Sequence, residues 1–343
     1  MGRKIILLSD GTGNSSAKVW RTNVWRTFEA LDLSGNDQIA FYDDGVGTSS
    51  FKPMAILGGA FGLGLRRNVI ALYKFACRNY HNADDELYGF GFSRGAFAIR
   101  SLAGFIDLAG LPKQPRALKE EELLEIYDAY MDGQLVDKAR YGTIDTMLDF
   151  IGVWDTVGAL AFGRTLGNFH RINPGNVRRV AHALALDEER ERFEPSYWDP
   201  PARAVTQIDE VWFSGCHTNI GGGYVDANLS NIALFWMLQS ARDAGLPLDA
   251  RGIPGFDLKD PRGLQRDSYK EFYDSMGLIG GIAESLNLKR EPRVIRAGQR
   301  IHQSVVDRTE ESSGQQPYVP KALFAGKPLS AESNPGIQPW GGF

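Results

Sequence analysis

Five short apolar runs in this 343-residue chain each end in a polar turn. The runs lie at 4–9, 38–42, 86–90, 148–154 and 210–214. Their nearly continuous apolar character is typical of strands that are covered on both faces of a parallel sheet. Stretches with helical spacing alternate with them, at 68–78, 96–108, 119–131 and 231–244. The alternation predicts an α/β fold, a three-layer sandwich with a mostly parallel central sheet and helical insertions.

We expect one large domain, because α/β chains of this length often form a single core. From about Arg251 the strand and helix signals weaken, and the end of the chain is rich in Gly, Pro and Ser. The sequence therefore predicts an α/β domain over 1–310 and a surface-wrapping or partly disordered tail over 311–343. Two apolar, glycine-interrupted stretches are candidate lid segments, and a buried loop accounts for each equally well. They lie at 53–65 and at 275–286. The basic pair Arg66-Arg67 follows the first stretch and is a candidate contact for a phosphate head group.

Composition argues against several classes of protein. The net charge is -4 and the Lys and Arg residues are dispersed, so we expect no nucleic-acid surface. Cys77 and Cys216 form no C-x-x-C pair, which predicts neither a disulfide framework nor a zinc site, and no motif calls for a cofactor. No apolar run approaches the roughly 18 residues that span a bilayer, and the run after Lys4 is too short for a signal peptide. We expect a cytoplasmic protein with at most peripheral membrane contact, and export without a cleavable signal stays open.

The pentapeptide Gly91-Phe92-Ser93-Arg94-Gly95 matches the G-x-S-x-G pattern. It joins an apolar run to a helical stretch, which is the strand-turn-helix setting of a nucleophile elbow. In such a turn the serine backbone is strained, and side chains in place of the glycines would collide with the neighbouring strand and helix. Ser93 is therefore the candidate nucleophile, and a helix cap is the alternative role.

A serine nucleophile needs a base, usually histidine, and the chain has five histidines. His217 follows the last predicted strand and precedes three glycines, so we expect it at the same edge of the sheet as Ser93. His217 is the first choice, against a structural role in its turn. The other histidines are the second choices His182 and His302, and then His81 and His170 in polar loops.

The base in turn needs a carboxylate that fixes its tautomer. Asp155 follows a predicted strand between Ser93 and His217, and it is the first choice. The resulting order of Ser, Asp and His along the chain is that of α/β-hydrolases. A capping role is the alternative for Asp155, and Asp226 is the second candidate acid.

An acyl-transfer intermediate also needs backbone N–H donors for its oxyanion. The residue after the nucleophile normally gives one donor, which here is Arg94, and the loop after a neighbouring strand gives the other. In that loop Gly11 and Thr12 are the candidates. The alternative, a phosphate-binding loop, lacks the Lys-Ser/Thr ending of a P-loop and one glycine of the dinucleotide pattern.

With these motifs in this order, the chain resembles the DUF2235 family of α/β-hydrolases, which includes the Tle1-type phospholipase effectors of bacterial type VI secretion. The matching motifs lie at 8–14, 44–48, 91–97 with Arg100, 152–158, 182–188, and 212–217 with 221–224, and a weaker match follows at 301–305. The resemblance implies a Ser93-Asp155-His217 triad and hydrolysis of lipid esters. The family often has Ser-Asp after the last histidine, where this chain has Thr218-Asn219, so we expect that acid's role in shaping the turn to be lost.

Three functions follow as hypotheses. The first is a serine hydrolase that cleaves carboxylic esters, lipid or phospholipid, through an acyl-enzyme on Ser93. The second is a catalytically idle hydrolase fold that serves as a binding or assembly module. The third is an acyltransferase or thioesterase with the same triad. The expected partners are an ester substrate and, for an effector, type VI secretion components or an immunity protein. We expect the chain to lack the long membrane-targeting regions of the secreted phospholipases, which argues against an effector role.

Overall fold

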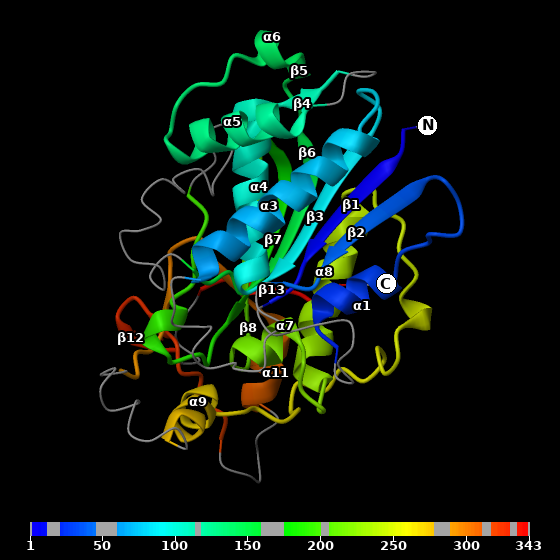
Figure 1. Ribbon diagram of the computed structural model, residues 1–343. Coiled ribbons are helices and arrows are strands. Elements are labelled where there is room, and N and C mark those ends of the chain that lie inside the picture. Colours follow the sequence, from blue (N-terminus) through cyan, green and yellow to red (C-terminus); the bar gives the residue numbers. More distant parts are fainter. Residues whose placement is uncertain are drawn as a thin grey trace.

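The described residues of this computed structural model form a parallel α/β sandwich (Figure 1). They are residues 2–11, 21–45, 60–113, 118–158, 175–199, 206–277, 289–310, 317–329 and 335–341. Eight strands make the central sheet in the order β13-β10-β8-β7-β6-β3-β1-β2, and all neighbouring strands run parallel. This confirms the α/β class predicted from the alternating runs.

The strands of the central sheet are β1 (Lys4–Ser9), β2 (Gln38–Asp43), β3 (Glu86–Phe92), β6 (Leu148–Trp154), β7 (Val177–Ala185), β8 (Gln207–Phe213), β10 (Arg300–His302) and β13 (Ile337–Gln338). Two small sheets contain β4 (Leu111–Pro112) with β5 (Thr143–Ile144), and β9 (Val294–Ile295) with β11 (Leu323–Phe324) and β12 (Lys327–Pro328). The helices are α1 (Asn23–Glu29), α3 (Ala60–Asn79), α4 (Arg94–Ala109), α5 (Glu120–Met131), α6 (Lys138–Tyr141), α7 (His217–Gly221), α8 (Asn228–Asp243), α9 (Ser268–Gly277) and α11 (Gln303–Glu310), with single 3-10 turns at Glu191–Phe193 and Ala250–Gly252.

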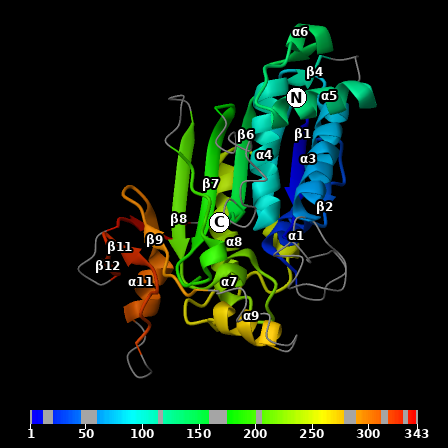
Figure 2. The same ribbon diagram turned by 60° about the vertical axis from the view of Figure 1, so that its left-hand side comes forward.

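Helices cover both faces of the sheet (Figure 2). The side chains of Ile5 and Leu7 in β1 pack with α3 and α4, whereas Ile6 and Leu8 pack with α1 and α8. All four side chains are fully buried. Burial of each one contributes roughly 1.5–3 kcal/mol to folding, which explains why this strand is apolar at four consecutive positions rather than at alternate ones.

Three strands of the central sheet, β7, β10 and β13, were not among the predicted strands, and β7 is the longest of them. Its sequence contains Arg178, Arg179, His182 and three alanines, none of which favours a strand. In the fold it lies between β6 and β8, and its second half is fully buried. Packing between two neighbours outweighs local preference there. By contrast, β1 and β6 match the predicted bounds.

The C-terminal part of the chain returns to the sheet. The short strand β10 pairs with β8, and β13 pairs with β10 at the sheet edge. The domain boundary at residue 310 stays a prediction. Of the candidate lid segments, residues 53–59 and 278–286 lie outside the described part, whereas Leu65 is buried within α3 and Arg66 Nη2 pairs with Asp128 Oδ1 on α5 at 3.1 Å. Among the described helices, none has the length and apolarity needed to cross a membrane.

Candidate active site

The carboxyl ends of β1, β3, β6 and β8 bring the predicted site residues to one edge of the sheet. Phe92 at the end of β3 is paired with Trp154 at the end of β6. Ser93 and Asp155 are the next residues of these two strands, so they start from neighbouring positions. His217 follows β8 as the first residue of α7, at the same end of the sheet (Figure 1). In open parallel sheets this edge is where ligands bind.

Ser93 occupies a strained turn between β3 and α4. Its φ is 58° and its ψ is -121°, a combination that non-glycine residues rarely adopt. The residue stands at the N-cap position of α4, yet its hydroxyl makes no capping hydrogen bond to the helix. The residue is 8% exposed. The strain is thus not explained by the alternative capping role, and it is the geometry that a nucleophile elbow requires.

The two glycines around Ser93 permit close backbone contacts. A Cβ at Gly91 would lie 2.6 Å from the Cα of Ala96, and a Cβ at Gly95 would lie 2.1 Å from the carbonyl oxygen of Ser9. The collisions expected with the helix and the neighbouring strand are therefore present. Through Gly95, the first turn of α4 is packed directly on the end of β1.

Gly95→Ala is expected to lower the free energy of unfolding by about 3 kcal/mol, because backbone atoms of Ser9 cannot rotate away from the added methyl group. Gly252→Ala is the matched control, since a Cβ there meets nothing within 4 Å. Urea denaturation of both variants measures the effect. Equal midpoints for Gly95→Ala and Gly252→Ala would contradict the close packing of α4 on β1.

His217 is bound to Asp155 and held between two rings. Its Nδ1 lies 2.5 Å from Asp155 Oδ2, and since a carboxylate only accepts, Nδ1 carries the proton. The imidazole centroid lies 4.6 Å from the Phe92 ring and 5.1 Å from the Phe193 ring. Phe92 is the residue before Ser93, so this ring contact joins His217 to the strand that ends at the serine turn.

The protonation states of this pair suit a base and its partner. Burial favours the neutral form of His217 and lowers its pKa, although the hydrogen bond and charge of Asp155 act in the opposite direction. Burial would raise the pKa of Asp155, but the charge of Arg293 and the hydrogen bond from His217 outweigh it and hold that pKa well below its ordinary value. Neutral imidazole thus faces an ionised carboxylate.

Arg293 is a partner of Asp155 that sequence patterns did not indicate. Its Nη1 donates to Asp155 Oδ1 at 2.6 Å and its Nη2 donates to Oδ2 at 3.0 Å. Asp155 itself has a positive φ of 44°, and its Oδ1 also accepts the N–H of Ala185 at 3.0 Å. Arg293 lies in a stretch with weak strand and helix signals, 138 positions from its partner, and no motif marks it.

A second buried carboxylate supports the turn of His217. Glu188 Oε2 accepts the His217 N–H at 3.3 Å and the Ser268 hydroxyl of α9 at 2.7 Å. Arg190 binds both oxygens of Glu188, through Nε at 2.7 Å and Nη2 at 2.8 Å. Burial would raise the pKa of Glu188, but Arg190 outweighs it and lowers that pKa to about 2. Glu188 belongs to the family motif at 182–188, and this motif was the sequence feature that could have identified it as part of the site.

The expectation that Thr218-Asn219 loses a turn-forming role is wrong. Asn219 Oδ1 accepts the N–H of Cys216 at 3.2 Å and that of Arg266 at 3.3 Å. Its Nδ2 donates to the carbonyl of Leu264 at 3.1 Å. An amide oxygen accepts as a carboxylate oxygen does, so Asn219 closes the turn that contains His217 and adds a donor that an acid lacks.

The other candidate bases and the second candidate acid have different partners. His182 Nε2 accepts the N–H of Thr156 at 3.2 Å, and its Nδ1 faces Glu210 Oε1 at 3.1 Å. Asp226 accepts from Asn228 and from the N–H of Leu264. His302 Nδ1 contacts the Ser304 hydroxyl, His81 Nε2 lies 3.2 Å from the Arg78 carbonyl, and His170 lies outside the described residues. The structure brings Asp155, not Asp226, to His217.

The three candidate oxyanion donors differ in their surroundings. Arg94 is the first residue of α4, and an amide at this position points away from the helix toward the space beyond its end. The Gly11 N–H donates to Asp10 Oδ1 at 2.6 Å, so it would have to exchange this acceptor to bind an oxyanion. Thr12 lies outside the described residues. Within the described ranges, no cluster of His, Cys, Asp and Glu is arranged to hold a metal ion.

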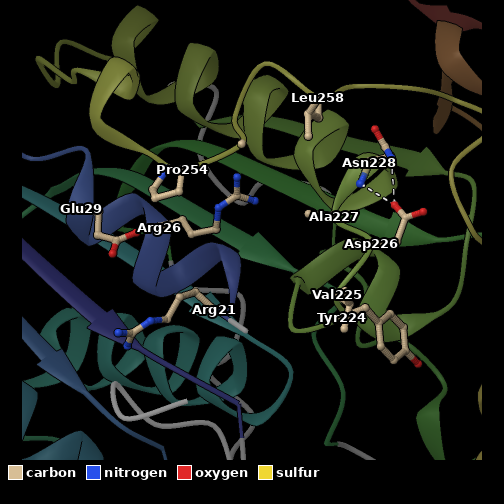
Figure 3. Close-up of a pocket in the computed structure, with 11 residues that line it drawn as sticks. Arg21, Arg26, Glu29, Tyr224, Val225, Asp226, Ala227, Asn228, Pro254 and Leu258 are labelled. Atoms are coloured by element: carbon tan, nitrogen blue, oxygen red, sulfur yellow. Dashed lines mark hydrogen bonds between the residues drawn. The ribbon is translucent and has the colours of Figure 1, made fainter. Parts of the chain in front are cut away.

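A pocket of about 550 Å³ lies between α1 and the chain that follows α7 (Figure 3). Arg21, Arg26 and Glu29 line one side, and Tyr224, Asp226 and Leu258 are among the residues on the other. An isolated bridge between Thr22 and Gly222 joins the two walls. The pocket therefore adjoins the chain segment that carries His217, and its lining bears charges of both signs.

Similar proteins were found by sequence and by structure. A protein of Saccharomyces cerevisiae, itself uncharacterized, is 25% identical over 228 residues, which are 58% of this chain and 33% of the yeast protein. The Tle1 effector solved bound to the VgrG spike of the type VI secretion system gives a TM-score of 0.46 at 16% identity, over 85% of this chain and 81% of that one. An uncharacterized Pseudomonas aeruginosa protein gives 0.43 at 18% identity, over 79% and 48%.

The matched region thus amounts to about a third of the yeast protein and half of the Pseudomonas protein. Residues 3–240 match the sequence model of the type VI secretion phospholipase effectors, Tle1-like, catalytic domain. This match confirms the resemblance seen in the ordered motifs. Since it covers well over half of the chain, the protein belongs to the family of Tle1-like catalytic domains of type VI secretion phospholipase effectors.

Proposed function

We propose that this protein is a serine hydrolase that cleaves carboxylic esters of lipids through an acyl-enzyme on Ser93. The observation that carries the proposal is the pairing of His217 with Asp155 at 2.5 Å, at the end of the strand that pairs with the strand of the strained Ser93 turn. A strained serine that makes no capping bond, at the same sheet edge as a neutral buried imidazole, suits a hydroxyl nucleophile with a histidine base.

The proposed reaction has two halves. Ser93 Oγ attacks the ester carbonyl carbon while His217 Nε2 takes its proton, and backbone N–H groups, Arg94 first among them, stabilise the oxyanion. The intermediate collapses, the alcohol leaves with the proton from His217, and the acyl group stays on Ser93. Water then attacks the acyl-enzyme with His217 as base, which releases the acid and restores Ser93. Asp155 stays ionised throughout and stabilises the imidazolium.

Lipid as the substrate class rests on family membership, since the family is named for phospholipase effectors. Export through a type VI secretion system, with its components or an immunity protein as partners, belongs to the same proposal. Two other functions use the same fold. An acyltransferase would pass the acyl group to an alcohol other than water, and an idle binding module would form no acyl-enzyme.

Lipid profiling tests the proposal. Purified protein is incubated with vesicles of mixed phospholipids, and mass spectrometry measures free fatty acids and lysophospholipids. We expect both products with the wild type and neither with Ser93→Ala. The control is Ser101→Ala, because the Ser101 hydroxyl is buried on α4 and donates to the Phe97 carbonyl within its own helix.

The remaining outcomes separate the alternatives. Cleavage of short p-nitrophenyl esters without any change in lipids would contradict the lipid assignment but keep the serine hydrolase. Acyl esters of an added alcohol, at the expense of free acid, would indicate an acyltransferase. No cleavage and no labelling of Ser93 by a fluorophosphonate probe would establish the idle module.

A further inference from the structure

Arg293 shields and orients the carboxylate that faces His217. Besides its two bonds to Asp155, its Nη1 donates to the Ala185 carbonyl at 2.9 Å and its Nη2 to the Phe193 carbonyl at 2.5 Å. The Arg293 side chain is 4% exposed and that of Asp155 is fully buried. Four hydrogen bonds therefore fix the plane of the guanidinium, and the planar fork in turn fixes the plane of the carboxylate.

We infer that Arg293 is a positioning residue of the proposed active site, which aligns Asp155 with His217 and limits how readily His217 becomes protonated. The inference rests on the proposed function. Both Arg293 and His217 bind Asp155 Oδ2, so the negative charge that would stabilise an imidazolium is shared with a permanent cation. His217 thereby remains a free base at lower pH than a histidine that has the carboxylate to itself.

The other charged groups described near Asp155 and His217 have partners of their own. Glu188 faces His217 and is neutralised by Arg190, and the buried Cys216 thiol next to His217 has a pKa raised to about 11. On the β7 side, His182 lies beside the turn of Asp155 and is bound to Glu210. Arg293 is thus the charge whose removal changes the balance at Asp155 most directly.

The segment that carries Arg293 lies beyond residues 3–240, where the family match ends. Its backbone is tied to the rest of the C-terminal part, because the Leu323 N–H donates to the Arg293 carbonyl at 2.7 Å. The same part is anchored at the end of β7, where Asp187 accepts the Tyr318 hydroxyl at 2.8 Å and the Lys321 N–H at 3.0 Å. The C-terminal part of the chain thus completes the site that the strand ends begin.

Rates of p-nitrophenyl ester hydrolysis as a function of pH test the inference. In Arg293→Met we expect kcat to fall at least about tenfold and the acidic limb of kcat/KM to move up by about one pH unit, because Asp155 no longer shares its negative charge with Arg293. Arg293→Lys keeps the cation without the fork, so its kcat should fall while its acidic limb stays in place. Arg100→Met is the control, since Arg100 is fully buried and donates to the carbonyls of Ser196 and Tyr197.

An acidic limb in Arg293→Met that coincides with the wild type would overturn the inference. If that variant does not fold, Arg293→Lys decides, because a wild-type kcat there would overturn the positioning role. A readout independent of activity is the NMR titration of the five histidines, with His217 assigned from His217→Ala. If His217 titrates at higher pH in Arg293→Met than in the wild type, the inference is supported. This holds even if the wild type cleaves no ester, a result that would contradict only the proposed function.

Discussion

Ser93→Ala and His217→Ala are each expected to lower the kcat for ester hydrolysis by about 10⁴–10⁶-fold, and the double variant is expected to lose no more than either single one. The two side chains act as a unit, because the hydroxyl is a weak nucleophile without the imidazole and the imidazole has no proton to accept without the hydroxyl. Residual activity would come from substrate binding and backbone donors to the oxyanion.

The measurement is steady-state hydrolysis together with covalent labelling by a fluorophosphonate. The label should appear on Ser93 in the wild type, vanish in Ser93→Ala and become at least about a thousandfold slower in His217→Ala. Ser101→Ala should behave as the wild type. Losses that multiply in the double variant would mean that Ser93 and His217 act independently, which contradicts the proposed mechanism.

Sequence patterns predicted the parts of the site that depend on local chain geometry. The turn of Ser93 follows a strand and opens a helix, and both glycines of its pattern make backbone contacts that leave no room for a Cβ. Asp155 and His217 were expected because each follows a strand, and parallel strands end at one edge. These inferences need only the order of strands and helices along the chain.

The parts that were missed depend on contacts between distant segments. Arg293 meets Asp155 across 138 positions, and Ser268 meets Glu188 across 80. A single buried ion pair leaves no periodic pattern, and an arginine in a weakly patterned stretch looks like a solvated one. Strand β7 was not predicted for a related reason. Its arginines, histidine and alanines form a strand only because β6 and β8 pair with it.

Asp155→Asn is expected to lower the free energy of unfolding by about 3–5 kcal/mol, because it leaves the buried guanidinium of Arg293 without its counter-charge. It should also reduce kcat by about 10⁴-fold, since an asparagine side chain can donate to Nδ1 and so stabilise the wrong tautomer of His217. Urea denaturation measures the first effect and ester hydrolysis the second. The control is Asp209→Asn, whose partly exposed pair with Arg300 at 2.6 Å should cost less than about 1 kcal/mol.

The double variant Asp155→Asn with Arg293→Met separates the two effects. Removing both charges eliminates the unpaired cation, so most of the stability lost in Asp155→Asn should return even though two hydrogen-bonding groups are gone. Activity should not return with it, because His217 still lacks the carboxylate that fixes its tautomer. A double variant as unstable as the sum of the two single variants would show that the two residues contribute independently. In that case the ion pair would not be what stabilises Asp155 in its strained turn.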